Sequence, residues 1–314
     1  AGGCGTGFRL TPPKRAGGTW TETILHRFGH AGDGFFPSSA PLPGDNGVLC
    51  GATEAGGDPK CGTRPFNTCG TVYELKPPRS SGGGWTKKVI CTFTNAADGY
   101  PEGDLTPYRG VIYGTTYGGP AGCGTVCGLA PPARPSGKWS YRTLYSFSCS
   151  APNAPLGGLI VGSGAVCGTS SFSPHGAGQG SVFALTQLAR SGSMWNIDTV
   201  LRFDGKNGSA PEGDLVAGKG GVLFGATGGG GNGPCANSIF GRGCGTVWQL
   251  APPAKAGGAW TQTVLYNFQK GRDGSLPIGI SAGGPNLLFG TTQAAGDSKC
   301  FAPSGCGTVF KLVP

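Results

Sequence analysis

The sequence predicts an all-β protein, a five-bladed β-propeller that forms one domain over residues 1–314. Two observations predict it. A short phrase that opens with Gly-Thr (once Gly-Ser) and closes on Leu recurs along the chain, starting at Gly5, Gly70, Gly124, Gly180, Gly245 and Gly307. The segments between copies are short apolar runs punctuated by Gly and Pro, without a helical period. Repetition of a small multi-stranded unit is typical of a propeller.

Each repeat contains four expected strands, which we name a to d from the innermost to the outermost of a blade. Strand a is Pro-led, as in PEGDL from Pro101 and from Pro211, and strand b is a run such as VIYGTT from Val111. Strand c is the repeated phrase. Strand d is a Trp-led run that alternates apolar and polar residues, as a strand with one buried face does. It begins at Trp20, Trp85, Trp139, Trp195 and Trp260, which gives five blades.

The leading Trp residues repeat in register, so we expect them to pack in the core or between blades. Trp248 replaces the aromatic residue of the phrase in its blade, and we expect it in the core as well. Asp-Gly or Asn-Gly turns join strand d to the next strand a, at Asp33, Asp98, Asn207 and Asp273. Asp in such a turn bonds its own backbone and Gly supplies the positive φ, so a structural role is expected for these residues.

The two ends of the chain predict a closed ring. The last blade has strands a, b and c, but no Trp-led strand follows Leu312, and the spare Trp-led strand lies near the N-terminus, from Trp20 to Phe28. Pairing that strand with the C-terminal blade would close the ring and remove a sheet edge. The phrase from Gly5 is then surplus. It either packs outside the ring or pairs with a neighbouring molecule by strand addition.

The series YGTT, GG, GTVFKL, Trp-led strand and DG-x-x-P resembles the GloVer tandem repeat of secreted and surface-anchored bacterial proteins. It is similar in layout to kelch propellers. The resemblance covers nearly the whole chain, and the third blade departs most, with SCSAPNAPLGG in place of the Asp-Gly turn. It implies an extracellular repeat protein and assigns no active site.

The cysteines favour an oxidising compartment. The chain contains 13 Cys, and three close pairs recur in one repeat position, Cys61 with Cys69, Cys235 with Cys244, and Cys300 with Cys306. We expect these to be disulfides; metal ligation is the alternative, but CxxC pairs are absent and the histidines are scattered. An odd count leaves a thiol free or pairing between chains. The sequence leaves open the pairing of Cys4, Cys50, Cys91, Cys123, Cys127, Cys149 and Cys167.

Localisation follows from the same features. The chain begins with Ala1 and its only Met is Met194, so we expect a processed, secreted or cell-surface protein whose signal peptide has been removed. No stretch approaches the roughly 20 apolar residues that would span a bilayer. No membrane span is therefore expected.

Strand order places the b–c and d–a connections on one face of the ring and the a–b and c–d connections on the other. The b–c loops are the longest, and each carries one aromatic residue outside the repeat pattern: Phe66, Tyr117, Phe172, Phe240 and Phe301. Exposed aromatic patches often mark contact sites, here for stacking on sugar rings. The alternative is that each ring folds back to pack its own loop.

Carboxylates are scarce, only 15 in all, yet PEGDL supplies Glu102 with Asp104 and Glu212 with Asp214. On the innermost strand, both pairs should lie near the central channel on one side of the strand. They could supply acid and base to a glycosidic bond, hold Ca²⁺, or be solvated or salt-bridged. The Pro-x-Gly-x-Leu repeat accounts for their positions without a catalytic role, so we expect no catalytic residue and no cofactor. Catalysis by these four residues and binding of Ca²⁺ remain the alternatives.

The net charge is +9, and part of the excess lies in the c–d loops, at Lys14, Arg15, Lys76, Arg79, Arg134, Lys138, Arg190 and Lys255. A face of one sign attracts polyanions such as acidic polysaccharide; a solvated surface is the alternative. Nucleic acid is not an expected partner, because the chain is exported and has no basic run interleaved with stacking aromatics.

The sequence thus predicts a secreted or cell-surface binding or structural propeller that contacts carbohydrate, another surface polymer or another protein through its b–c loop face. We expect a binding protein rather than an enzyme. One alternative is a glycan-cleaving enzyme, a glycoside hydrolase or polysaccharide lyase, that uses the channel carboxylates. Another is a self-assembling structural protein, a homo-oligomer or filament, joined through the surplus phrase and Cys4.

Overall fold

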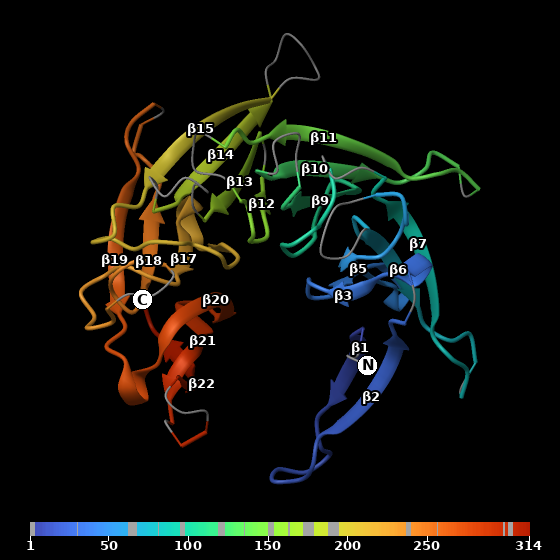
Figure 1. Ribbon diagram of the computed structural model, residues 1–314, viewed down its shortest axis with the longest axis horizontal. Coiled ribbons are helices and arrows are strands. Elements are labelled where there is room, and N and C mark those ends of the chain that lie inside the picture. Colours follow the sequence, from blue (N-terminus) through green and yellow to red (C-terminus); the bar gives the residue numbers. More distant parts are fainter. Residues whose placement is uncertain are drawn as a thin grey trace.

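The strands form sheets that follow one another in an arc around a common centre (Figure 1). The computed structural model describes residues 4–29, 31–61, 68–80, 82–94, 98–118, 123–134, 136–149, 154–162, 164–171, 179–187, 195–236, 240–255, 257–297, 299–300 and 304–314. All regular structure in these residues is β-strand apart from four short 3-10 helices, Ala31–Asp33, Asp45–Gly47, Lys219–Gly221 and Gly271–Asp273. The predicted all-β, five-bladed propeller is confirmed.

The four strand types of a blade are present as expected. Strand a is β3 (Phe35–Pro37) with β4 (Leu42–Pro43), β8 (Thr106–Tyr108), β12 (Ile160–Val161), β16 (Val216–Ala217) and β20 (Ser275–Gly284). Strand b is β5 (Leu49–Ala55), β9 (Val111–Thr116), β13 (Ala165–Ser170), β17 (Leu223–Thr227) and β21 (Leu287–Gly296). Strand c is β1 (Thr6–Thr11), β6 (Thr71–Lys76), β10 (Thr125–Ala130), β14 (Ser181–Gln187), β18 (Thr246–Ala251) and β23 (Val309–Leu312). Strand d is β2 (Thr21–Arg27), β7 (Thr86–Thr92), β11 (Ser140–Ser146), β15 (Trp195–Arg202) and β19 (Thr261–Asn267), and the short β22 (Gly305–Gly307) precedes β23.

A glycine of strand b lies opposite the aromatic residue of strand c in most blades. Gly225 pairs with Trp248, and a Cβ added at Gly225 would overlap the indole ring, which is fully buried. Gly51 stands in the same relation to Tyr73, and Gly290 to Phe310. The repeated Gly of strand b and aromatic of strand c are therefore one packing unit, since the ring fills the space that a side chain would occupy.

The core lies between neighbouring blades. One cluster, for example, joins Val72 and Phe93 of the first blade to Leu105 and Ile112 of the second. Four of the five leading Trp residues pack against such clusters: Trp85, Trp139, Trp195 and Trp260. Trp20 differs, because its side chain is 58% exposed.

The Pro-led segments depart from the prediction. Residues 101–105 are not a strand: only Pro101 bridges to Thr116, and β8 begins at Thr106. We call residues 101–105, and the equivalent 211–215, inner straps. Their central glycines approach the next blade closely, since a Cβ on Gly103 would overlap the carbonyl oxygen of Gly157. This close approach leaves no room for a side chain and explains the Gly at the middle of each strap.

The expected ring-closing pair is absent from the described residues. β2 pairs with β1 from Thr6↔Arg27 to Thr11↔Thr21, and β23 pairs with β21 alone. The phrase from Gly5 is thus not surplus: it takes the strand c position beside β2, with the bulge that the complete blades have at this point. A hairpin closed by a short loop loses far less chain entropy than a pair closed across the whole sequence. The two-stranded sheet β1–β2 and the C-terminal blade form the two ends of the arc (Figure 1).

The cysteines form the three expected disulfides, Cys61–Cys69, Cys235–Cys244 and Cys300–Cys306. A fourth, Cys123–Cys149, ties the end of a b–c loop to the d–a connection of the third blade, the place where that blade lacks the Asp-Gly turn. The free cysteines are Cys4, Cys50, Cys91, Cys127 and Cys167. Burial raises the pKa of Cys91 to about 11, which leaves this thiol in its unreactive form near neutral pH.

The turn residues have the predicted structural role. The carboxylate of Asp273 accepts a hydrogen bond from the Gln269 N–H at 2.6 Å, and that of Asp33 accepts one from the Gly29 N–H at 3.2 Å.

In the described part of the chain, no helix is long and apolar enough to cross a membrane.

Candidate functional site

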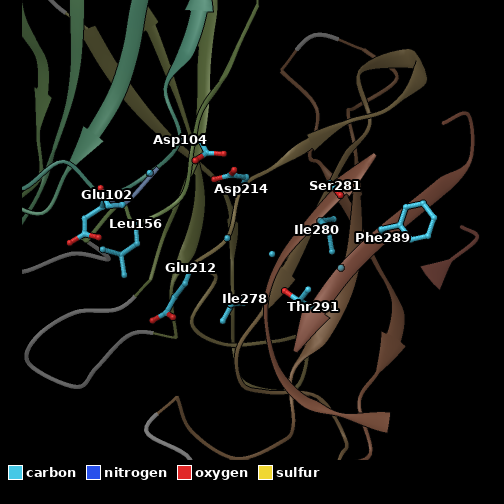
Figure 2. A pocket seen from close by; sticks show the side chains of 15 residues that line it. Glu102, Asp104, Leu156, Glu212, Asp214, Ile278, Ile280, Ser281, Phe289 and Thr291 are labelled. Atoms are coloured by element: carbon cyan, nitrogen blue, oxygen red, sulfur yellow. The ribbon is translucent and has the colours of Figure 1, made fainter. Parts of the chain in front are cut away.

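Both inner straps line one cavity near the middle of the arc, with a volume of about 370 Å³ (Figure 2). The straps bring together all four carboxylates that the sequence singled out, Glu102, Asp104, Glu212 and Asp214. The corresponding wall positions of the other blades are uncharged, with Ser38, Leu156 and Ile278. The cavity is therefore acidic on the two blades that carry PEGDL.

The two strap aspartates hold neighbouring blades together. Asp104 accepts a hydrogen bond from the Ala40 N–H at 2.6 Å, and Asp214 accepts one from the Gly158 N–H at 2.5 Å. In each case the donor belongs to the preceding blade. Gly158 has no room for a side chain, because an added Cβ would lie 2.8 Å from Asp214 Oδ1. These aspartates thus have a structural task that the sequence did not reveal.

Asp104 and Asp214 also face each other (Figure 2). The pKa of Asp214 is raised to about 6, mainly because the carboxyl group is buried. The charge of the neighbouring Asp104 and a hydrogen bond with it also raise this pKa. The two straps thus bring carboxyl groups of different blades close together, in addition to the bonds that each makes to its preceding blade.

The two strap glutamates are less constrained. Within the described residues, neither side chain has a hydrogen-bond partner in the protein. Burial, followed by the charges of Glu54 and Glu212, raises the pKa of Glu102 to about 7. Burial raises the pKa of Glu212 to about 6. Both carboxyl groups line the cavity without a partner among the described residues, so they are available to a ligand.

Glu54 is a site residue that sequence reasoning missed. It lies near the end of β5, burial raises its pKa, and its charge acts on Glu102. Glu54 follows the Gly-Ala-Thr of strand b, as Tyr117 follows Gly-Thr-Thr in the next blade. Aligning the repeats at this position would have placed both residues at the same rim of the channel.

The aromatic set of the b–c loops is only partly visible. Phe66, Phe172 and Phe301 lie outside the described residues. Tyr117 is 46% exposed, and its N–H donates to the Tyr100 carbonyl at 2.7 Å, beside the strap that carries Glu102. Phe240 is half-buried over Gly228, 3.2 Å from the position of an added Cβ. Tyr117 thus offers a ring to solvent, whereas Phe240 packs on its own blade.

The basic residues of the c–d loops are exposed: Lys14, Arg15, Lys76, Arg79, Arg134, Lys138 and Lys255. Arg190 lies outside the described residues. Lys76 forms an ion pair with Glu74 at 3.5 Å. Among the described residues, no group of three or more His, Cys, Asp or Glu side chains is placed to hold a metal ion.

Comparisons with known proteins give a family and a fold. A family model described as the Gloeobacter/Verrucomicrobia repeat matches residues 62–310. No curated protein matches the sequence. Among solved structures, the PQQ-bound aldose sugar dehydrogenase of Streptomyces coelicolor is 13% identical, covers 93% of this chain and 84% of its own, and has a TM-score of 0.51. The α-L-arabinanase of Penicillium chrysogenum with arabinobiose is 12% identical, covers 80% of this chain and 76% of its own, and has a TM-score of 0.46.

Proposed function

The chain belongs to the Gloeobacter/Verrucomicrobia repeat family, and we propose that it is a carbohydrate-binding propeller whose ligand lies in the strap cavity at the b–c loop face. Four disulfides are typical of proteins that act in an oxidising compartment. The proposed site of action is therefore outside the cytoplasm, at or beyond the cell surface.

The observation that carries the proposal is that the cavity has two kinds of lining residue. The inner straps contribute Glu102 and Glu212 to its lining, and the C-terminal blade contributes Ile278, beside Glu212, together with Ile280 and Phe289 (Figure 2). A sugar ring has hydroxyl groups at its edge and C–H groups on its faces. Carboxylates accept hydrogen bonds from the hydroxyl groups, and an aromatic or aliphatic surface packs on the C–H faces.

Two further features support the proposal. The side chain of Phe289 is 40% exposed, so its ring is accessible for stacking. Tyr117 provides a second exposed ring at the rim next to Glu102. Exposed aromatic side chains close to unpartnered acceptors are the usual components of a contact site for a polar ligand with apolar faces.

The first expected result is binding of a neutral oligosaccharide that is lost when the strap glutamates are changed. A glycan array, followed by titration calorimetry with the best ligand, would measure it. The Glu102→Gln, Glu212→Gln double variant should bind at least about tenfold more weakly, because each carboxylate hydrogen bond contributes about 1.5–3 kcal/mol. Phe289→Ala and Tyr117→Ala should weaken binding as well.

Matched controls are available on the same molecule. Glu22→Gln changes an exposed carboxylate on β2, and Phe240→Ala changes a loop ring that packs on its own blade. Both variants should keep the affinity. An array without any bound glycan, or binding unaffected by the Glu102 and Glu212 changes, would contradict the proposal.

A second candidate, cleavage of a glycan, is favoured by the raised pKa values of the two glutamates. With the higher pKa, Glu102 would donate a proton to the glycosidic oxygen, and Glu212 would act as the carboxylate on the opposite side of the bond. Incubation of the bound glycan with the protein, followed by product analysis, should then show hydrolysis that Glu102→Gln reduces by roughly 10²–10⁴-fold. An intact glycan after prolonged incubation would leave binding as the function.

A further inference from the structure

The two faces of the molecule differ in charge. The a–b turns and the c–d loops lie on one face and touch there, since a Cβ on Gly47 of an a–b turn would lie 3.5 Å from Pro77 of a c–d loop. In the described residues, the c–d loops carry exposed basic side chains at Lys14, Arg15, Arg79, Arg134, Lys138 and Lys255. The a–b turns add Arg109 and Lys219, which are exposed as well. We call these residues together the basic rim.

Few carboxylates accompany the basic rim. Among the described residues of the same loops and turns, Asp45 is the one acidic residue, and Glu22 stands nearby at the start of β2. No rim residue takes part in an ion pair in this part of the chain. The ion pairs that the described residues form are those of Asp33 with His26 and Lys87, at 2.9 and 3.0 Å, and of Glu74 with Lys76, at 3.5 Å. The rim therefore carries positive charge that the protein itself does not neutralise.

The c–d loops that begin with Pro-Pro hold their charges in one repeated geometry. Their sequences are PPKRAGG from Pro12, PPRSSGG from Pro77, PPARPSG from Pro131 and PPAKAGG from Pro252. The last Gly of each donates its N–H to the carbonyl oxygen three residues earlier, at 3.2 Å for Gly18, 3.1 Å for Gly83, 2.9 Å for Gly137 and 3.1 Å for Gly258. A Cβ on that Gly would lie between 2.7 and 3.0 Å from the Cβ of the second Pro. Each loop is thus a closed turn packed on its own proline, with a basic residue at its third or fourth position.

Arg109 gives an independent indication that the charge has a role beyond the stability of its turn. Its φ is +48°, in the left-handed region. The corresponding turn residues of two other blades are Asn46, with a φ of 55°, and Gly220, with a φ of 66°. Asn and Gly are the residues that tolerate this conformation. The Arg109 guanidinium lies 5.3 Å from the centroid of the Tyr108 ring, so this contact positions the charge at the surface.

We propose that the basic rim is a binding surface for an acidic polysaccharide that lies across several blades. The rim cations belong to different loops, so a small anion would contact one loop, whereas a polymer contacts several at once and gains affinity from each. Guanidinium groups match carboxylate and sulfate groups in geometry. Because the loops are closed turns, little chain entropy is lost when they bind.

Other polyanions fit the basic rim less well. Between the proline pair and the leading Trp, these loops contain no large apolar residue that could enter a bilayer. The four disulfides are typical of an oxidising compartment, whereas nucleic acid is mainly intracellular. A polysaccharide is therefore favoured over an anionic membrane and over nucleic acid.

This inference goes beyond the proposed ligand of the strap cavity and does not depend on it. The rim and the strap cavity share no residue, and the strap carboxylates would repel an acidic polymer. The variant Glu102→Gln, Glu212→Gln should therefore keep its affinity for such a polymer. Failure of either proposal would leave the other standing.

The probes are polygalacturonate, which carries carboxylates, and dextran sulfate, with uncharged dextran as the control. Biolayer interferometry with each immobilised polymer would measure binding of the whole protein. We expect saturable binding to both charged polymers that weakens at least about tenfold when NaCl is raised from about 0.05 to about 0.5 M, because salt screens exposed charges. Dextran should show no salt-dependent binding.

The rim itself is tested by removing charge from three loops, with Arg15→Gln, Arg134→Gln and Lys255→Gln in one protein. This rim variant should bind both charged polymers about tenfold more weakly, because three exposed charge contacts together correspond to about that factor. Arg109→Asn should weaken binding as well and leave the protein at least as stable, since Asn suits the turn.

A matched control removes the same charge from the opposite face, with Lys60→Gln, Lys206→Gln and Lys270→Gln, all at exposed positions. The control variant should keep the affinity within about twofold, because charges far from the polymer are screened. Absence of binding to both charged polymers, or equal losses in the rim and control variants, would overturn the proposal. Tighter binding to duplex DNA than to either polysaccharide at equal salt would overturn it too. A thermal unfolding curve of each variant confirms that it is folded.

Discussion

Replacing Asp33 with Asn is expected to lower the free energy of unfolding by about 3–5 kcal/mol, the usual loss when a buried charge is left without its partner. Lys87 would then be the uncompensated charge, with a side chain only 5% exposed. Burial lowers the pKa of Lys87, and its contacts with Asp33 oppose this shift. Urea unfolding followed by Trp fluorescence would measure the loss.

The double variant Asp33→Asn, Lys87→Met separates the charge from the packing. Methionine keeps the apolar contact with the rings of Phe28 and Tyr73, so the double variant should be more stable than Asp33→Asn alone. Lys88→Met is the matched control, since Lys88 is the exposed neighbour on the same strand, and it should change stability by no more than about 0.5 kcal/mol. A loss from Asp33→Asn that is no larger than that of the control would contradict the inter-blade role of the pair.

The free energy of unfolding is expected to fall as the pH rises from about 4.5 to 7. Burial is the main cause of the raised pKa values of Glu102, about 7, and Glu212, about 6, against a value of 4.5 without the fold. Between these limits the folded state binds more protons than the unfolded chain. The stabilisation is therefore complete below pH 4.5 and lost as the pH rises through the folded pKa.

The expected change is on the order of 1–3 kcal/mol for each glutamate, because one pKa unit corresponds to about 1.4 kcal/mol and partial exposure reduces the effect. Urea unfolding at pH 5 and at pH 8 would measure it. Glu102→Gln with Glu212→Gln should reduce the dependence and leave the variant more stable than the unchanged protein at pH 8. A smaller dependence of the same sign should remain, because burial also raises the pKa values of Asp214 and Glu54. Glu22→Gln, on an exposed strand, should leave the slope as it is.

The lowered pKa of Asp33 does not obscure this result. Burial raises the pKa of that carboxyl, but hydrogen bonds from His26 and Lys87 together outweigh burial and bring it below its usual 3.8. The contribution of Asp33 is thus present above about pH 3.8 and lost only at lower pH. A stability that rises between pH 5 and 8, in a protein that unfolds reversibly, would show that the strap glutamates are not desolvated in the fold.

For the inner straps, the sequence predicted where the carboxylates lie but not the separate roles of the aspartates and the glutamates. The sequence predicted that Glu102, Asp104, Glu212 and Asp214 lie together at the channel, and all four line one cavity. It could not divide them by role. The aspartates bond the backbone of the preceding blade at Ala40 and Gly158, and such donors are visible only when the blades are side by side.

Contacts between blades explain the other differences. The Asp33–Lys87 pair joins residues 54 positions apart, and the Cys123–Cys149 disulfide joins residues 26 apart. Spacing within one repeat predicted Cys61–Cys69 because both residues belong to one loop. A partner in the next blade has no fixed spacing in the sequence, because loops of different lengths intervene.

The sequence by itself determined the fold: the phrase of strand c, the glycine opposite its aromatic residue and the Asp-Gly turns are local patterns, and each repeats in nearly every blade. Local patterns are readable because strand alternation and turn geometry act over a few residues. The tertiary structure decided the rest, namely the pairing of β1 with β2, the contact between Asp104 and Asp214, and the position of Lys87 between the rings of Phe28 and Tyr73. These depend on burial and on charges brought together across blades, and neither can be read from residues that are distant in the chain.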